Sequence, residues 1–323
     1  MMKKEQIKAN TGDNSTNPLV SIVVITYNSA EFVLETLESA KAQSYSNIEL
    51  IVSDDCSKDK TLEICRSWIA INKNRFISTQ IIEAKKNTGI IGNCNRSIKA
   101  ANGEWLKLIA GDDILMNTCV EDFVSYCSTH PECKVVFGRA FSLTNQELTP
   151  LPLQKIALAK PEEQKKIIFT SRPWPGINAT TSFFYKTTLI DIGGFDTNYQ
   201  VMEDLPMWAR YVNNNITFHF INKFVTQYRI HENNISGNRS ALFMNERLYN
   251  DKKKYIKNVL FPYNLKQRNF GLILHFYNYF AISDLILFFG NKNNFLSKIL
   301  SRLIILHFKN EIIFKTKRLL KSN

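Results

Sequence analysis

The chain has 323 residues, of which 44% are hydrophobic and 22% are charged. This length exceeds that of a small domain held together by disulfides, and the apolar content is enough for a core, which excludes general disorder. The net charge is +12, but the 14 basic and three acidic residues from Asp251 onward account for +11 of it. A nearly neutral globular part with a basic C-terminal region is therefore expected, unlike a uniformly basic nucleic-acid-binding protein.

The N-terminal residues and the cysteines contain no targeting or disulfide signal. Residues 1–17 are polar and lack an apolar segment, which predicts a disordered lead and neither a signal peptide nor a membrane anchor. The six cysteines form no C-x-x-C pair and no cysteine–histidine cluster with zinc spacing. We therefore expect a protein of a reducing compartment, in which the cysteines act as small apolar residues.

Strands and helices alternate along the first third of the chain. Short β-branched apolar runs predict strands, and the segments between them place apolar residues at helical spacing. The predicted strands are 19–26, 48–52, 77–83 and 105–109. This alternation predicts βαβ units and a mostly parallel sheet with helices on both faces.

The second half is less regular. Its predicted elements are a helix over 117–130, strands over 135–137 and 179–185, a loop over 143–160, and a helical run after residue 204. Residues 272–289 form the most apolar run, which contains His275 and Asp284. Because polar groups in mid-membrane are costly, we predict an amphipathic or buried helix there rather than a membrane span.

Polar clusters follow three of the predicted parallel strands, and such sheets bind ligands beyond the carboxyl ends of their strands. The clusters are Tyr27-Asn28, Asp54-Asp55 and Asp112-Asp113. Adjacent carboxylates need a cation or hydrogen-bond donors. The last cluster therefore predicts Mg²⁺ or Mn²⁺ bound through carboxylates and substrate phosphates. Alternatively, one Asp caps the next helix and the other is solvated, and the middle cluster is only a capping loop.

Several nucleotide-binding and catalytic motifs are absent from the sequence. There is no P-loop, no G-x-G-x-x-G after the first strand and no G-x-S-x-G. These absences count against a P-loop ATPase, a dinucleotide-dependent dehydrogenase and an α/β-hydrolase. A metal–diphosphate site without a glycine cradle is typical of sugar-nucleotide transferases.

Seven short segments, in their order and spacing, resemble the family 2 glycosyltransferases. They are Val20–Asn28 (VSIVVITYN), Val52–Asp59 (VSDDCSKD), Asn87–Gly89 (NTG), Gly103–Asp113 (GEWLKLIAGDD), Gly193–Asp196 (GGFD), Glu203-Asp204 and Tyr228–His231 (YRIH). The resemblance spans about residues 19–236. It implies an α/β GT-A fold, that is, a Rossmann-like mixed central sheet flanked by helices, here with a C-terminal basic helical extension.

The resemblance also implies a domain division and a nucleotide site. A catalytic domain would cover 18–240, with a nucleotide-binding half at 18–115, an acceptor half at 116–240, and a basic amphipathic helical region at 241–323. Tyr27 would pack against the base, Asp54 would accept from its N–H, and Asp113 would lie beside the donor sugar or ribose. The full set expected to bind the nucleotide is Thr26, Tyr27, Asn28, Asp54, Asp55, Gly89 and Asp113.

The catalytic and metal residues follow from the same resemblance. Glu203-Asp204 matches the acid pair near the acceptor, with Asp204 as catalytic base. Asp112 would hold the metal on the diphosphate, with His231 as a further ligand or, alternatively, a histidine hydrogen-bonded within a loop. Ala110 stands where the family's Asp-x-Asp motif usually begins with Asp, which predicts weaker metal binding.

Four other side chains have two interpretations each. Arg229 and Arg239 either meet diphosphate oxygens or are solvated and salt-bridged. Trp174 and Trp208 either stack on sugar faces or belong to the core.

The resulting hypothesis is an inverting glycosyltransferase of surface polysaccharide synthesis. It would move a hexose or N-acetylhexosamine from a nucleotide diphosphate sugar, with UDP expected, to a hydroxyl of a lipid-linked or oligosaccharide acceptor. One alternative is a non-catalytic membrane-associated GT-A scaffold, which Ala110 favours. Another is a sugar-phosphate nucleotidyltransferase, although its Gly-rich basic signature is missing from residues 29–38.

Apolar and basic residues interleave from residue 252 onward. This pattern predicts amphipathic helices with cationic faces, and hence a cytoplasmic protein bound peripherally at the inner face of the cell membrane. A helical bundle packed on the catalytic domain, or a dimer contact, is the alternative. RNA binding is a weaker interpretation because no nucleic-acid motif occurs.

Overall fold

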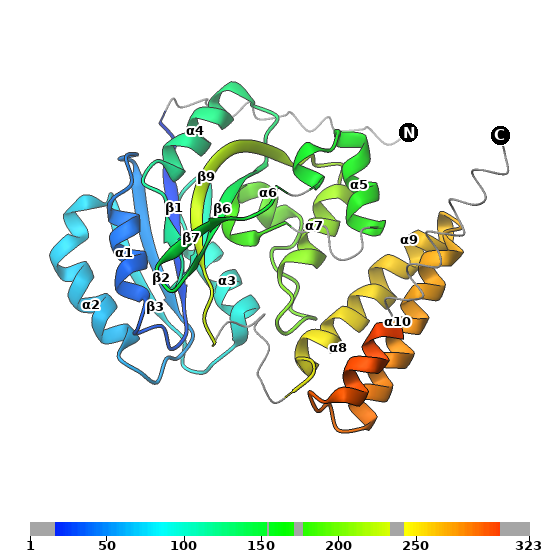
Figure 1. Ribbon diagram of the computed structural model, residues 1–323. Coiled ribbons are helices and arrows are strands. Elements are labelled where there is room, and N and C mark those ends of the chain that lie inside the picture. Colours follow the sequence, from blue (N-terminus) through cyan, green and yellow to red (C-terminus); the bar gives the residue numbers. More distant parts are fainter. Residues whose placement is uncertain (1–16, 154, 171–176, 233–241, 304–323) are drawn as a thin grey trace, which may run out of the picture.

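The computed structural model describes residues 17–153, 155–170, 177–232 and 242–303. An α/β part forms one side of the molecule, and long C-terminal helices lie along the other (Figure 1). The predicted lead therefore lies outside the described residues except for Asn17, as do Trp174, Arg239 and the end of the basic region. The predicted domain boundary at residue 240 falls in the same excluded part.

Four parallel strands form the first half of the central sheet. They are β3 (Ser78–Glu83), β2 (Ile48–Asp54), β1 (Val20–Thr26) and β4 (Trp105–Ala110), in that spatial order. β1 pairs in parallel with both β2 and β4, and every residue of β2 is buried. Complete burial of β-branched and leucine side chains is expected where helices cover both faces of a parallel sheet.

Alternate residues of these strands point to two separate cores. Val23 and Ile51 pack in one core with α3 (Gly89–Ala100) and α7 (Asp204–Asn213). Ile22 packs in the other with α1 (Val33–Lys41), α2 (Thr61–Asn72) and α4 (Cys119–Thr129). The two-residue period of a strand thus gives the sheet its helical layers.

The second half of the sheet is mixed in direction. It contains β5 (Ile114–Leu115), β6 (Val135–Thr144), β7 (Glu147–Pro150), β8 (Ser182–Tyr185) and β9 (His219–Arg229). β8 is antiparallel to β4 and β6, whereas β6 and β9 are parallel. The fold class expected from the sequence, a mixed GT-A sheet flanked by helices, is confirmed.

The predictions for this half were incomplete. The predicted strand at 135–137 continues to Thr144, so the predicted loop over 143–160 was wrong: it contains the end of β6, β7 and a 3₁₀ turn at Lys155–Leu158. β9 was not predicted at all. β6 and β9 pair with each other, and the register of this pairing shifts near Gly138. The strands are so close there that a Cβ atom on Gly138 would lie 2.6 Å from the Val225 side chain. Such long-range pairing leaves no local periodic signal.

Two further helices, α5 (Pro161–Thr170) and α6 (Lys186–Asp191), lie beside α7 in the second half (Figure 1). α7 packs deeply against the sheet: its Trp208 is fully buried, stacked on Phe184 and edge-on to Phe137. Trp208 is therefore a core residue, and the sugar-stacking interpretation of this side chain was wrong.

The C-terminal region folds back onto the α/β part. α8 (Glu246–Tyr255), a π-helical turn (Ile256–Leu260) and α9 (Phe261–Lys266) run in succession, and α10 (Phe270–Phe288) returns beside them (Figure 1). Tyr255, Leu260 and Phe276 belong to the same core as α7, and the Asn264 amide donates to the Phe169 carbonyl at 3.0 Å. The described part of this region is thus a helical bundle packed on the α/β part, which agrees with the alternative interpretation of its sequence.

α10 is the described helix with the length and composition of a membrane span. It has 19 residues and a mean hydropathy of 1.4, and 33% of its apolar window is buried. Its inner face supplies Leu272, Phe276 and Phe280 to the core, whereas Leu274, Tyr277 and Phe288 are exposed. Core helices of globular proteins can have the same length and composition, so these two properties alone do not indicate a membrane span. The unusual feature of α10 is the set of apolar side chains exposed on its outer face.

Candidate functional site

The register of the parallel strands brings three polar clusters to one edge of the sheet. Thr26 at the end of β1 pairs with Asp54 at the end of β2, and Ile25 pairs with Ala110 at the end of β4. Tyr27-Asn28, Asp54-Asp55 and Asp112-Asp113 therefore follow neighbouring strands. This is the edge at which open α/β sheets bind their ligands.

The Asp54 carboxylate organises the loop after β2. It is fully buried, and it accepts hydrogen bonds from the Thr26 hydroxyl at 2.8 Å, the Ser57 backbone N–H at 2.8 Å and the Ser57 hydroxyl. Tyr27, in contrast, is 48% exposed. Of these residues, Tyr27 is the one that is open to a ligand. The N–H group of a nucleotide base could bond to Asp54 only by sharing its carboxylate with the three donors that already occupy it.

Asn28 joins the first cluster to the second. Its backbone has a left-handed φ of 51°, its N–H donates to the Ser57 hydroxyl at 2.8 Å, and its side-chain oxygen accepts from the Lys58 N–H at 2.8 Å. Asparagine tolerates this conformation better than most residues. The turn that presents Tyr27 is thereby anchored to the loop after β2.

The Asp55 carboxylate connects the same loop to the start of α3. It accepts from the backbone N–H groups of Thr88 at 2.8 Å and Gly89 at 2.7 Å, and from the Arg96 guanidinium at 3.1 Å. Gly89 has a φ of +77°, and a Cβ atom there would lie 3.7 Å from the Gln200 carbonyl oxygen. The predicted nucleotide half therefore meets the loop before Glu203-Asp204 at Gly89.

The two predicted metal ligands are in direct contact. Nε2 of His231, just beyond β9, lies 3.0 Å from Oδ2 of Asp112, just beyond β4. The His231 ring also packs against Phe32, with 4.9 Å between the ring centroids. Because β9 was not predicted, only the family resemblance indicated that a residue 119 positions away would meet Asp112.

Arg229, the last residue of β9, holds the loop that carries Asp112 in place. Its Nε donates to the Asp112 carbonyl at 2.8 Å, its backbone N–H donates to the Asp113 carboxylate at 2.9 Å, and its Nη2 pairs with Glu35 of α1 at 2.8 Å. The guanidinium also lies 4.7 Å from the centre of the Phe32 ring. This geometry agrees with the salt-bridged interpretation of Arg229.

Asp113 is buried, whereas the neighbouring Asp112 is partly exposed. Oδ1 of Asp113 accepts from Arg229, whereas its Oδ2 has no hydrogen-bond partner among the residues that the structure describes. Burial, and then the charge of Asp112, raise the pKa of the Asp113 carboxyl well above its ordinary value. Asp113 thus favours its protonated form, and Asp112 is the carboxylate of the pair that is open to solvent.

The Asp112–His231 pair fits a divalent cation. Neighbouring ligands in an octahedral shell with metal–ligand distances of about 2.1 Å lie roughly 3 Å apart, which matches the separation of Oδ2 and Nε2. No group of three or more metal-binding side chains occurs in the described ranges. The protein would therefore supply two ligands, and water and substrate phosphate the others.

Glu203 and Asp204 lie at the N-terminus of α7, both half-buried. Burial raises the pKa of Asp204 to about 6, and Oδ1 of Asp204 accepts from the Leu205 N–H at 2.7 Å. Burial, with the charge of Asp204 as the next cause, raises the pKa of Glu203 to about 8. The pair therefore shares one negative charge near neutral pH, carried by Asp204, which the helix N-terminus also favours.

A residue outside every sequence motif supports this acid pair. Asp251 of α8 accepts three backbone N–H groups from Gln200, Val201 and Met202. The neighbouring turn is held to α3 by Asn95, which accepts from the Phe195 N–H at 2.9 Å and donates to the Phe195 carbonyl at 2.7 Å. No sequence signal distinguished Asp251 from other acids on predicted helices.

Comparison with known proteins identifies the family of this fold. The family model described as "Glycosyl transferase family 2" matches residues 21–190, more than half of the chain. The chain is similar to UDP-Glc:alpha-D-GlcNAc-diphosphoundecaprenol beta-1,3-glucosyltransferase WfaP of Escherichia coli, with 27% identity over 68% of this chain and 81% of the relative. It is also similar to an uncharacterized glycosyltransferase of Rickettsia typhi, with 26% identity over 68% of this chain and 66% of that protein.

The solved structures agree with the fold. The chain is similar to S. aureus TarS in complex with UDP-GlcNAc, with a TM-score of 0.55, 21% identity, and coverage of 69% of this chain and 62% of TarS. The chain thus spans a little under two thirds of the TarS chain and of the Rickettsia relative. The resemblance stated from the sequence motifs is confirmed.

The raised pKa of Glu203 predicts how stability depends on pH. Between the ordinary pKa near 4.5 and about 8, the folded protein binds more protons at Glu203 than the unfolded chain does. The contribution of Glu203 to the free energy of unfolding must therefore fall as pH rises through this range. Glu203→Gln removes that loss. We therefore expect urea unfolding to show that wild type and variant are equally stable at about pH 4, and that the variant is more stable than wild type by at least about 1 kcal/mol at about pH 8.5.

The exposed Glu63 provides the control for this measurement. Glu63→Gln changes the same functional group on the surface of α2, where no burial penalty exists, and should follow the wild-type pH curve. Parallel curves for wild type and Glu203→Gln would contradict the raised pKa.

Proposed function

Because the chain belongs to glycosyl transferase family 2, we propose that it is an inverting glycosyltransferase of surface polysaccharide synthesis. It moves a hexose or N-acetylhexosamine from a UDP-sugar to a hydroxyl group of a lipid-linked or oligosaccharide acceptor. The observation that carries the proposal is the 3.0 Å contact between Asp112 and His231 at the ligand-binding edge of the sheet. It would provide a cation site for a diphosphate where no glycine cradle exists.

The similar proteins support the donor and acceptor of this proposal. The name of WfaP specifies a UDP-Glc donor and a diphosphoundecaprenol-linked acceptor, and TarS has been solved with UDP-GlcNAc. We propose the same classes here, a UDP-sugar and a lipid-linked saccharide. Membership of this family also counts against the alternative of a sugar-phosphate nucleotidyltransferase.

The proposed donor site uses the loops after β1, β2 and β4. The exposed Tyr27 ring stacks on the base. The buried carboxylates of Asp54 and Asp55 hold the backbone below the nucleotide in place, together with Thr26, Asn28 and Gly89. Asp113 lies beside the donor sugar or ribose. A divalent cation, Mg²⁺ or Mn²⁺, held by Asp112 and His231 would neutralise the leaving diphosphate.

In the proposed reaction, Asp204 is the general base. Its carboxylate accepts the proton of the acceptor hydroxyl as that oxygen bonds to the anomeric carbon. The bond from this carbon to the diphosphate oxygen breaks on the opposite face, so the configuration inverts, and the electron pair leaves with the nucleoside diphosphate. Glu203 remains protonated at neutral pH because of its higher pKa. General-base assistance of this kind contributes roughly 10²–10⁴-fold to the rate.

A non-catalytic scaffold remains the second candidate, because Ala110 replaces the first acid of the family's metal motif. Slow release of UDP from UDP-glucose or UDP-N-acetylglucosamine without an acceptor distinguishes the two. A transferase should show such hydrolysis above the uncatalysed rate, whereas a scaffold should not.

Substitution of the base tests the proposed chemistry. We expect Asp204→Asn to lower the transfer rate by at least about 10²-fold, because the amide cannot accept the proton, and to leave UDP affinity within about twofold. Titration calorimetry with UDP and a UDP-release assay measure the two quantities. Asp191→Asn, the same change on the exposed end of α6, is the matched control, and normal turnover in Asp204→Asn would exclude this role.

The cation site is tested by Mn²⁺ binding rather than by activity. We expect Asp112→Asn and His231→Ala each to weaken Mn²⁺ binding in the presence of UDP by about tenfold or more, as measured by electron paramagnetic resonance of the free ion. Ala110→Asp should strengthen binding by adding a carboxylate. His130→Ala, at the residue that follows α4, is the control, and unchanged Mn²⁺ affinity in both ligand variants would refute the site.

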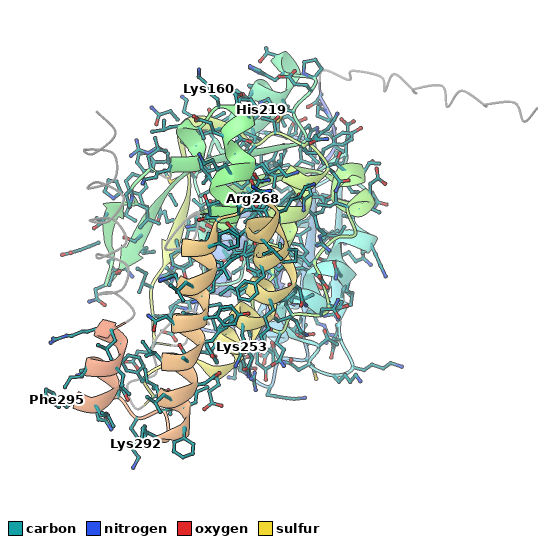
Figure 2. The ribbon with its side chains drawn as sticks, turned by 90° about the vertical axis from the view of Figure 1, so that its right-hand side faces the viewer. Lys160, His219, Lys253, Arg268, Lys292 and Phe295 are labelled. Atoms are coloured by element: carbon teal, nitrogen blue, oxygen red, sulfur yellow. The ribbon has the colours of Figure 1, made fainter. Side chains whose placement is uncertain are left out.

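We further propose that this transferase is a cytoplasmic protein that binds the inner membrane surface through its C-terminal edge, which we define as residues 288–303. Phe288 and Phe295 are about four-fifths exposed there, with Lys292, Lys298 and Arg302 among them. Figure 2 shows Lys292 and Phe295 together at the lower tip of the helices, at the opposite end from Lys160 and His219. Aromatic and cationic side chains in one place suit the interface of an anionic bilayer.

Full-length variants test the membrane proposal without removing core helices. We expect Phe288→Ser with Phe295→Ser to reduce co-sedimentation with phosphatidylglycerol–phosphatidylethanolamine vesicles by about fivefold or more, since partial burial of each ring contributes on the order of 1 kcal/mol. Ile71→Ser removes an equally exposed apolar side chain from α2 and should have no effect. Equal sedimentation of the double variant and wild type would disprove the proposal.

A further inference from the structure

The segment Gln200–Met202 is held by a single carboxylate oxygen of the C-terminal helices. Oδ2 of Asp251 accepts the backbone N–H groups of Gln200 at 2.8 Å, Val201 at 2.7 Å and Met202 at 3.0 Å. Asp251 lies on α8 and is 4% exposed. Three consecutive N–H groups that converge on one oxygen make a recess for an anion, in which an ionised acceptor is much stronger than a neutral one.

This recess directly precedes the proposed catalytic pair. Met202 is followed by Glu203 and Asp204, where α7 begins, so the orientation of the three peptide units determines where the acid pair enters the site. The Lys254 ammonium, also from α8, donates to the Asn198 carbonyl at 2.7 Å in the same loop. Side chains of α8 therefore help to position this loop, in addition to contacts within the acceptor half.

The same loop reaches the nucleotide half. The carbonyl oxygen of Gln200, whose N–H donates to Asp251, faces Gly89, where a Cβ atom would lie 3.7 Å away. Gly89 in turn donates to Asp55. Gln200 therefore lies between Asp251 of α8 and the Gly89 turn that Asp55 holds, so a shift at Asp251 is expected to alter the distance between the base and the donor.

We propose that Asp251 is a positioning residue for sugar transfer, which fixes the segment 200–202 and thereby aims Asp204 at the acceptor hydroxyl. The C-terminal helical region is then an integral part of the catalytic unit and not only an attachment to a membrane. This inference rests on the proposed role of Asp204 as base. Misplacement of a reacting group by about 1 Å costs on the order of 10²-fold in rate, so a modest shift would be measurable.

Asp251→Asn tests the inference in the full chain, since it keeps the size of the side chain and removes its charge. We expect kcat for transfer to fall by about tenfold or more, UDP affinity to stay within about twofold, and the amides of residues 200–202 to exchange hydrogen faster. Asp251→Glu restores the charge and should recover part of kcat. If the Asn variant does not fold, Asp251→Glu tests the same anchor by displacing the carboxylate: it should lower kcat relative to wild type, speed exchange at 200–202 and leave UDP affinity within about twofold.

Asp284→Asn is the matched control, because Asp284 is an acid of the same helices that pairs with Lys253 and not with the loop. Equal kcat in the two Asn variants, or unchanged exchange at 200–202 in Asp251→Asn, would overturn the inference. So would a loss of UDP affinity in step with kcat, which would indicate general destabilisation. If wild type transfers no sugar, the proposed function fails, and the exchange measurement alone decides whether Asp251 orders the loop.

Discussion

Buried carboxylates that accept hydrogen bonds from backbone N–H groups hold the loops of this site in place. An ionised carboxylate is costly to remove from water unless donors replace its hydration. Asp55 finds those donors in the N–H groups of Thr88 and Gly89, and Asp251 finds them at residues 200–202. Movement of either loop would remove backbone donors from a buried carboxylate, so each carboxylate fixes the segment that carries another part of the site.

The sheet determines where these loops meet. α1, α2 and α4 cover one face of the parallel strands and α3 covers the other. The connection that leaves β1 and the connection that enters β4 therefore lie on opposite faces, and the ends of these two neighbouring strands mark the switch point at which such sheets bind ligands. The change to antiparallel pairing at β8 then lets β9 run alongside β6 and end beside Asp112. Residues from distant parts of the sequence thus reach one edge without a motif that links them.

The sequence allowed the parallel half of the fold to be predicted, because each strand there is a short apolar run and each helix has its own periodic face. β9 and the second half of β6 were missed, since they are stabilised by each other and neither has a regular alternation of apolar and polar residues. The contact between His231 and Asp112 depends on β9, and only the family resemblance suggested it. Asp251 could not have been predicted, because its role arises from a contact across about fifty residues and not from any local pattern.

In the proposed cation site, Ala110 lowers the number of carboxylates and leaves Asp112 and His231 in place. Burial favours the protonated form of Asp113, and the charge of Arg229 is paired with Glu35, so the carboxylate of Asp112 supplies the negative charge that faces solvent. One carboxylate and one imidazole bind a hard divalent cation weakly in water. The donor diphosphate carries the missing negative charge and further oxygen ligands. In the proposed mechanism, cation and nucleotide sugar would therefore bind together, each raising the affinity for the other, as the linkage between two ligands at one site requires.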